Sequence, residues 1–262
     1  MPKVKILSID GGGIRGILAG VVLTRLEEKL QILSKDKDVK LADFFDLFAG
    51  TSTGGILTLS YLIADENQRP LLSAQEAVDL YLKKGGEIFD VSLWQKIKSG
   101  GGILDEKYDE KSLEASLEAT FKDLTLKDLI KPCIISSYDV WNGKPHFFKQ
   151  HKSENKIYNY KIKDVARATS AAPTYFEAAQ IENEIGTSFT LVDGGTFANN
   201  PSMVAYSEAR AMTFDNKVKD WGQIQWVKPV IEIMMSGNSE ATHYHLAQIF
   251  DTLKPIRQKL LS

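Results

Sequence analysis

Hydrophobic and polar residues follow two different spacings along the chain, one typical of buried strands and one typical of amphipathic helices. Residues 4–9 and 43–49 are short apolar-rich runs, the first followed by Asp10 and three glycines and the second by Gly50, which predicts two strands. After each run, apolar residues recur at helical spacing, over about 14–31 and 53–64. We expect the first of these helices to turn a polar face to solvent at Glu27, Glu28 and Lys29.

The same alternation continues along the rest of the chain. It predicts further helices and strands, the helices over about 74–89, 111–121, 164–170, 201–212 and 241–253, and the strands over 133–138, 144–149, 189–192 and 230–235. Strands that alternate with helices indicate an α/β fold in which helices cover a mainly parallel sheet. In such a sheet, the side chains that bind ligands or catalyse reactions lie at the carboxyl ends of strands. No repeat or long linker divides the sequence, so we expect a single domain over 1–262.

Composition and charge narrow the class of protein. Hydrophobic residues make up 43% and charged residues 25%, as in ordinary globular proteins. The net charge of -2 and the pI of about 6.1 give no basic footprint, so we expect no nucleic-acid partner. No apolar run reaches the roughly 20 residues of a membrane-spanning helix, and the first apolar stretch is too short for a signal peptide. We therefore expect a cytoplasmic protein, with its one cysteine, Cys133, in the core.

The segment Gly50-Thr51-Ser52-Thr53-Gly54 is the strongest chemical signal in the sequence. It has the form Gly-x-Ser-x-Gly, and it lies between a predicted strand and a predicted helix. Small neighbours allow a serine to occupy a sharp, strained turn, and the helix that follows directs free N–H groups at the site. Ser52 is therefore our candidate nucleophile, against the alternative of a tight turn with a capping serine.

A glycine-rich segment, Asp10-Gly11-Gly12-Gly13-Ile14-Arg15-Gly16, follows the first predicted strand. Glycine backbones approach a ligand closely, and their N–H groups can converge on one negative oxygen, so Gly12 and Gly13 are candidate oxyanion donors. Arg15 is either a phosphate contact at the rim or a solvated charge. The segment also has the glycine spacing of a dinucleotide site. That site needs an acidic residue ending a second strand about 20 residues on, whereas Glu27 and Glu28 fall in mid-helix.

The third candidate is Asp193, which ends a predicted strand and is followed by Gly194 and Gly195. A carboxylate within hydrogen-bond reach of a serine accepts its proton as the serine attacks. An aspartate in an ordinary β-turn is the alternative.

Histidine and metal chemistry give weaker alternatives. A Ser–Asp–His triad in the chain order Ser52, Asp193, then His243 or His245 is possible. The four histidines lack the spacing of metal ligands, and no cysteine or glutamate pair supports them, so we expect no metal and no cofactor.

Together the three motifs resemble the patatin-like phospholipases, whose sequences show Asp-Gly-Gly-Gly-x-Arg-Gly, then Gly-x-Ser-x-Gly, then Asp-Gly-Gly or Asp-Gly-Ala. Residues 168–176 and the run Asn199-Asn200-Pro201 are also similar to that family. The resemblance covers about residues 4–237, which we take as the core of the domain.

The resemblance implies a three-layer α/β/α fold and a Ser–Asp dyad without histidine. Ser52 would attack an acyl ester, Asp193 would act as base, and the amides of Gly12 and Gly13 would hold the oxyanion. The implied partners are phospholipids or other acyl lipids, met by transient contact with a membrane surface. A lipid hydrolase of this kind is our first interpretation, and the alternatives are a small-ester hydrolase and a binding protein without turnover.

Residues 85–104 carry several large apolar side chains between flanking glycines. They suggest either a mobile cover that meets the lipid surface or a loop packed on the core.

Overall fold

The computed structural model describes residues 4–13, 16–80, 110–212 and 214. These residues belong to one compact unit, Pro2–Asn216. The predicted cover over 85–104, the predicted strand over 230–235 and the predicted helix over 241–253 lie outside the described residues, and so do Arg15 and the two C-terminal histidines.

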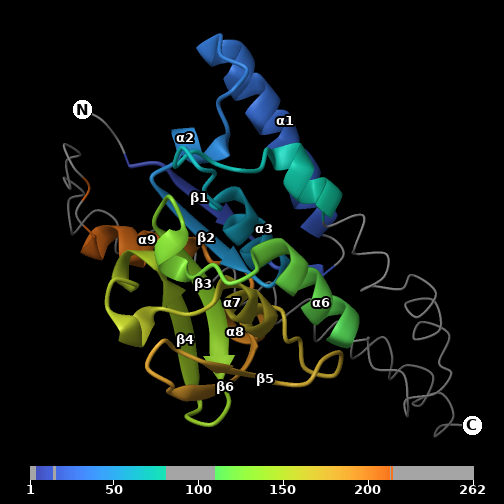
Figure 1. The fold of residues 1–262 in the computed structure, drawn as a ribbon, viewed down its shortest axis with the longest axis vertical. Helices are drawn as coiled ribbons and strands as arrows, with labels where there is room; N and C mark the ends of the chain where they lie inside the picture. The colour runs from blue at the N-terminus through green and yellow to red at the C-terminus, as the bar shows by residue number, and fades with distance from the viewer. Residues whose placement is uncertain (1–3, 14–15, 81–109, 213, 215–262) are drawn as a thin grey trace, which may run out of the picture. The chain divides into compact units, whose positions relative to one another are not determined.

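A six-stranded mixed sheet forms the centre of this unit (Figure 1). Its strands are β1 (Ile6–Ile9), β2 (Leu47–Thr51), β3 (Cys133–Asp139), β4 (Lys144–Lys149), β5 (Ala179–Glu182) and β6 (Ser188–Asp193). Hydrogen bonds join them in the order β1-β2-β3-β6-β5, with β4 paired to β3. The pairings make β1, β2, β3 and β5 run in one direction and β4 and β6 in the other. The prediction of a mainly parallel sheet is confirmed.

Strand β3 has three neighbours, although a strand has only two edges. β4 pairs along residues 134–139 of β3 and therefore occupies one whole edge. β2 pairs with residues 133–136 and β6 with residues 137–139, so these two strands share the other edge end to end. Because β6 is antiparallel to β3, the carboxyl ends of β2 and β6 meet halfway along that edge.

Helices cover both faces of the sheet. They are α1 (Gly16–Ser34), α2 (Leu41–Phe44), α3 (Thr53–Tyr61), α6 (Glu110–Phe121), α7 (Ile162–Thr169), α8 (Gly195–Ala198) and α9 (Ser202–Ala211), with short 3₁₀ turns at Leu126–Asp128, Gln150–Lys152 and Lys156–Tyr158. A further helical stretch covers 74–80. One face packs against α1, α3, α6 and α7, and the other against α8 and α9. The result is the three-layer α/β/α arrangement.

Successive side chains of β2 point to opposite faces of the sheet, so this one strand packs against both helix layers. Phe48 packs with the core on the α3 side, whereas Leu47 and Ala49 pack against Ala205 of α9 on the other side. All five residues of β2 are buried, as expected for a strand covered on both faces. Cys133 belongs to the first of these cores, as predicted, and burial raises the pKa of its thiol to about 12.

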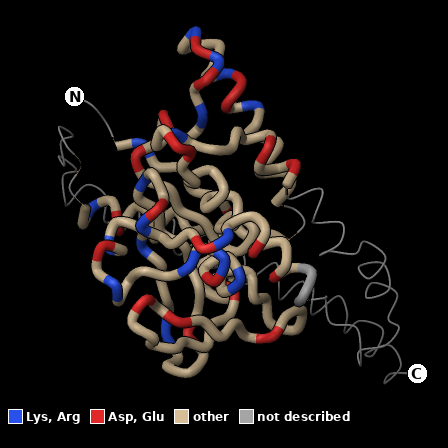
Figure 2. The backbone as a smooth tube through the Cα atoms, viewed as in Figure 1, with Lys and Arg blue, Asp and Glu red and all other residues tan. Residues whose placement is uncertain are grey.

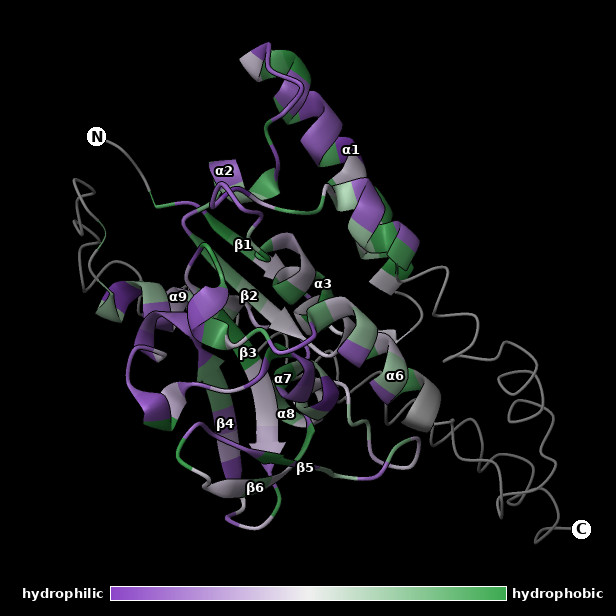
Figure 3. Ribbon diagram, in the orientation of Figure 1, coloured by the Kyte–Doolittle hydropathy of each residue, from purple (hydrophilic) through white to green (hydrophobic). Residues whose placement is uncertain are grey.

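Most elements agree with the sequence pattern, and β5 is one that the pattern did not predict. β5 is short, it lies at the end of the strand order, and it alternates buried and exposed residues. In Figure 3, α1 shows hydrophilic and hydrophobic residues side by side, and several of its large apolar residues, among them Leu18, Val22 and Leu33, are exposed.

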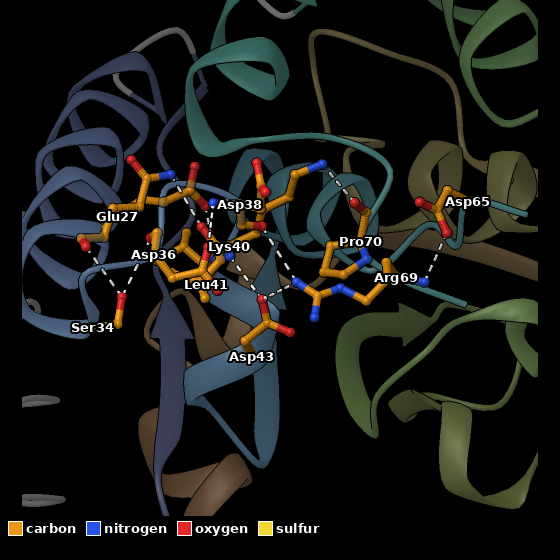
Figure 4. A network of polar contacts seen from close by, with 12 residues as sticks. Glu27, Ser34, Asp36, Asp38, Lys40, Leu41, Asp43, Asp65, Arg69 and Pro70 are labelled. Atoms are coloured by element: carbon orange, nitrogen blue, oxygen red, sulfur yellow. Dashed lines mark hydrogen bonds and ion pairs between the residues drawn. The ribbon is translucent and has the colours of Figure 1, made fainter. Parts of the chain in front are cut away.

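The prediction for Glu27 was wrong, because its side chain is not on a solvent-facing surface. Glu27 is only 4% exposed. Its two carboxylate oxygens accept hydrogen bonds from the backbone N–H groups of Leu41, at 2.9 Å, and Ala74, at 2.8 Å. Both amides lie at the start of a helix, where N–H groups lack partners within the helix. Glu27 therefore ties α1 to two other segments, beside a network of Lys40, Asp43 and Arg69 (Figure 4).

Charged residues of both signs are interspersed along the described backbone (Figure 2). Several form ion pairs between elements, such as Lys149 with Glu208 and Arg167 with Glu114. Within the described ranges, no helix has the length and apolar character required to cross a bilayer.

Candidate active site

Ser52 lies on a strained turn between β2 and α3. Its backbone angles are φ 55° and ψ -127°, in a region that side-chain-bearing residues rarely occupy. The flanking glycines make the turn possible. A methyl group on Gly50 would lie 2.4 Å from the carbonyl oxygen of Gly54, and one on Gly54 would lie 2.3 Å from the carbonyl oxygen of Ile9. The Gly-x-Ser-x-Gly pattern therefore allows α3 to pack directly onto β1 and β2.

Asp193 meets Ser52 at the point where β2 and β6 end against each other. The Ser52 hydroxyl donates a hydrogen bond of 2.6 Å to Oδ2 of Asp193. Both residues are nearly buried, with exposed fractions of 8% and 5%. The other carboxylate oxygen, Oδ1, accepts a hydrogen bond of 2.6 Å from the backbone N–H of Gly195. The antiparallel direction of β6, rather than parallel strands ending at one edge, brings the two predicted residues together.

Burial sets the electrostatics of this pair. It raises the pKa of Asp193, since the charged carboxylate is removed from water, while the hydrogen bonds from Ser52 and Gly195 partly oppose that rise. A carboxylate with a raised pKa is a stronger base than an ordinary one and accepts a proton more readily.

The glycine loop after β1 lies directly against the serine. A methyl group on Gly11 would come within 3.1 Å of Cβ of Ser52 and 2.5 Å of the side-chain oxygen of Asn199. The backbone N–H of Gly11 donates to the carbonyl oxygen of Asn199 at 3.0 Å. Gly13 has a φ of 57°, which favours glycine. The structure thus places Gly11 of this loop next to Ser52, and Gly12 and Gly13 follow it in the chain, whereas Arg15 is not among the described residues.

Thr169 was not among the predicted site residues, although it lies within residues 168–176, the stretch that is similar to the patatin-like family. Thr169 is completely buried at the end of α7, and its hydroxyl oxygen accepts a hydrogen bond of 2.9 Å from the backbone N–H of Ser52. A second unexpected contact joins the hydroxyl of Thr51 to the carbonyl oxygen of Ala198, at 2.8 Å. A hydroxyl that bonds to distant backbone leaves no periodic signal in a sequence.

The two described histidines are engaged elsewhere. The ring of His146 packs against Phe148 and Phe189, and burial lowers its pKa to about 4. His151 contacts Glu208 on α9 at 2.8 Å. Neither forms one of the hydrogen bonds of Ser52 or Asp193 described above. The triad alternative, which requires His243 or His245, thus concerns residues outside the described part of the chain.

The described residues show no cluster of three or more His, Cys, Asp or Glu side chains that could hold a metal ion. What they bring together is a hydroxyl, a buried carboxylate and a glycine loop. A serine on a strained turn, bonded to a carboxylate and adjacent to a glycine-rich loop, is an arrangement typical of serine hydrolases that act on esters.

Comparison with known proteins gives the family. The profile described as patatin-like phospholipase matches residues 7–206. Patatin-like protein 2 of Oryza sativa subsp. indica is 32% identical over 300 residues, which cover 96% of this chain and 74% of that protein. A Solanum tuberosum protein named probable inactive patatin-3-Kuras 1 is 30% identical over 289 residues, or 95% of this chain and 75% of its own length.

Among solved structures, the crystal structure of VipD from Legionella pneumophila overlaps with a TM-score of 0.38 at 16% identity, over 74% of this chain and 46% of that one. The sequence relatives and the profile show that the chain belongs to the patatin-like phospholipase family. By family it is a lipid acyl hydrolase, a kind of carboxylic ester hydrolase. Because a relative named as inactive matches almost as well as the others, catalysis has to be inferred from Ser52 and Asp193 themselves.

Proposed function

We propose that this chain cleaves the fatty-acyl ester bonds of phospholipids or related glycerolipids, with Ser52 as nucleophile and Asp193 as base. The observation that carries the proposal is the hydrogen bond of 2.6 Å from the Ser52 hydroxyl to the buried Asp193 carboxylate, formed on a strained turn. Family membership supports the substrate class.

In the first half of the reaction, Oγ of Ser52 attacks the ester carbonyl carbon while its proton moves to Oδ2 of Asp193. The tetrahedral intermediate then collapses, the bond to the glycerol oxygen breaks, and Asp193 returns the proton to that oxygen. The alcohol leaves and the acyl group stays on Ser52.

In the second half, Asp193 accepts a proton from a water molecule whose oxygen attacks the acyl carbon. The bond to Oγ breaks, the fatty acid is released, and the proton held by Asp193 returns to Ser52. The raised pKa of Asp193 helps in both halves, because the carboxylate has to hold a proton transiently in each.

The backbone N–H groups of Gly12 and Gly13 are the proposed donors to the oxyanion. Support comes from the position of their loop, where Gly11 would touch Cβ of Ser52 if it carried a methyl group. Arg15 follows this loop in the sequence, and its role stays as predicted, either a contact to a lipid phosphate or a solvated charge.

The setting of the reaction follows from the substrate. We propose a single domain that works in the cytoplasm and contacts a membrane surface transiently while it takes up lipid. In this proposal it requires no metal or organic cofactor and binds no nucleic acid. The two alternatives are hydrolysis of small soluble esters at the same site, and a Ser–Asp–His triad completed by His243 or His245.

Hydrolysis assays separate these possibilities. Fatty-acid release from phosphatidylcholine vesicles and release of nitrophenol from a soluble ester would be measured for the full chain, for Ser52→Ala and for the double variant His243→Ala/His245→Ala. We expect wild type and the histidine variant to act on both substrates and Ser52→Ala to act on neither. Activity on the soluble ester alone would favour the small-ester alternative. Loss in a folded histidine variant would favour the triad, and full activity of Ser52→Ala would overturn the proposal.

A further inference from the structure

The carboxyl end of α7 contacts both halves of the candidate active site. At Thr169, the last residue of the helix, the side chain bonds to the backbone of Ser52. Two residues later, the carbonyl oxygen of Ala171 accepts a hydrogen bond of 2.9 Å from the backbone N–H of Asp193. One short segment therefore holds the main chain of the nucleophile and the main chain of its base.

The hydroxyl of Thr169 makes two hydrogen bonds in a chain. It accepts from the Ser52 N–H at 2.9 Å and donates to the carbonyl oxygen of Ser136 in β3 at 2.6 Å. Because the proton of the hydroxyl is used on Ser136, its lone pair is directed at Ser52. The hydroxyl of Thr169 thereby links the Ser52 turn to β3, the strand on whose edge β2 and β6 meet.

Sterics hold Thr169 in this position. A methyl group on Gly55 would lie 2.9 Å from Cγ2 of Thr169 and 3.2 Å from its hydroxyl oxygen, so the side chain packs tightly against the first turn of α3. A similar contact lies beside Asp193, where the hydroxyl of Ser137 donates to the carbonyl oxygen of Val192 at 2.7 Å.

The strained backbone of Ser52 needs contacts that hold it in place. A residue held at an unfavourable φ and ψ relaxes unless its surroundings determine its conformation. The bond at the Ser52 N–H restrains the main chain of the residue whose Cα–Cβ bond carries Oγ. A displacement of the reacting atoms by 1 Å can cost roughly 100-fold in rate.

We propose that Thr169 is a positioning residue for the reaction, whose hydroxyl holds the Ser52 turn so that Oγ stays within hydrogen-bond reach of Asp193. It touches neither substrate nor the reacting atoms and acts through the Ser52 backbone. This inference rests on the proposed function of Ser52 and Asp193. The competing role is purely structural, in which Thr169 only ties α7 to β3 through Ser136.

The experiment uses a graded series in the full chain. Thr169→Val keeps the shape and removes the hydroxyl, whereas Thr169→Ser keeps the hydroxyl and removes the methyl group. Thr58→Val is the matched control, because Thr58 is a fully buried threonine of α3 whose hydroxyl bonds to the carbonyl oxygen of Ala49 at 3.4 Å and does not contact Ser52. The measurements are the second-order rate of Ser52 labelling by a long-chain alkyl fluorophosphonate, kcat and KM on a soluble ester, and Tm.

We expect Thr169→Val to lower both kcat and the labelling rate by roughly 10- to 100-fold with little change in KM. Thr169→Ser and Thr58→Val should stay within about threefold of wild type, since they leave the bond to Ser52 in place. A structural role would lower Tm without moving the kcat of the folded fraction. If Thr169→Val does not fold, Thr169→Ala measured well below its Tm replaces it, with the same loss expected.

The outcomes separate this inference from the function on which it rests. Wild-type rates in a folded Thr169→Val or Thr169→Ala variant, beside a labelled wild type, would overturn the positioning role and leave the hydrolase standing. Equal losses in Thr169→Ser and Thr169→Val would also overturn it, because the hydroxyl would not be the cause. Absence of Ser52 labelling in every sample, wild type included, would overturn the proposed function and the inference together.

Discussion

Asp193 and Glu27 are two buried carboxylates that receive the same number of hydrogen bonds from different kinds of donor. Burial raises the pKa of both. Glu27 accepts from two backbone amides, those of Leu41 and Ala74, which cannot give up their protons. Asp193 accepts from one backbone amide and from the hydroxyl of Ser52, whose proton can be transferred.

The difference shows that a raised pKa alone does not identify a catalytic carboxylate. Glu27 joins the starts of two helical segments to α1, beside a network of charged side chains (Figure 4). Asp193 sits at the junction of two strand ends beside a strained serine and a glycine loop. The identity of the hydrogen-bond donor, rather than burial, separates the structural role of Glu27 from the chemical role proposed for Asp193. Substitution of Glu27 should therefore lower stability, and substitution of Asp193 should lower activity.

The largest effect is expected for Asp193→Asn. An amide cannot accept the serine proton, so kcat on a soluble ester should fall by roughly 10³- to 10⁴-fold while the fold persists. Asp139→Asn is the matched control, because Asp139 is also a buried aspartate at a strand end, and its oxygens accept from the backbone and side-chain amides of Asn142. A kcat for Asp193→Asn within tenfold of wild type would remove Asp193 from the mechanism.

Glu27→Gln should lower stability rather than chemistry. The amide group presents a donor where a buried backbone N–H needs an acceptor, which is expected to cost about 1–3 kcal/mol of unfolding free energy. Glu28→Gln is the matched control, since the exposed side chain of Glu28 forms an ion pair with Arg25, and the loss of that pair should cost less than about 1 kcal/mol. Chemical denaturation would measure both, and kcat of the folded protein should stay near wild type. A large fall in kcat for Glu27→Gln at full stability would contradict the comparison.

The smallest effect is expected in the pH dependence of kcat/KM, whose acid limb should be shifted upward from the ordinary pKa of aspartate. Asp193 has to be ionised to accept a proton, and burial raises its pKa above 3.8, the ordinary value. Activity should therefore be lost as pH falls through that raised pKa, so the limb of kcat/KM lies above 3.8. The same shift means that the folded state binds the proton more tightly than the unfolded state. The contribution of Asp193 to the free energy of unfolding is therefore present below pH 3.8 and is lost as pH rises through the raised pKa of the folded state. A limb at or below 3.8 would show that Asp193 is not the titrating base.

The layers of the fold could be predicted from the sequence, and the proposed site residues lie in short motifs, because both leave local signals. The spacing of apolar residues predicts the helices α1, α3 and α6 and the strands β2 and β3, and glycines on both sides of Ser52 indicate the strained turn. Four strands of the sheet run in one direction, as the alternating pattern suggested.

The remaining features depend on long-range contacts that no local pattern carries. The antiparallel direction of β6 follows from its pairing with residues 137–139 of β3. Glu27 looks like its solvent-facing neighbour Glu28 in the sequence, and only the approach of Leu41 and Ala74 makes it a buried residue. Thr169 is one threonine among several until the fold places it at the Ser52 backbone.

The most direct test of the central claim is the labelling of Ser52 by a long-chain alkyl fluorophosphonate, with the adduct mapped by mass spectrometry in wild type, Asp193→Asn and Glu27→Gln. We predict an adduct on Ser52 in wild type and in Glu27→Gln, and none in folded Asp193→Asn over the same time. A label on Ser52 of Asp193→Asn at the wild-type rate, or a wild-type protein labelled elsewhere and not on Ser52, would contradict a Ser–Asp dyad at this site.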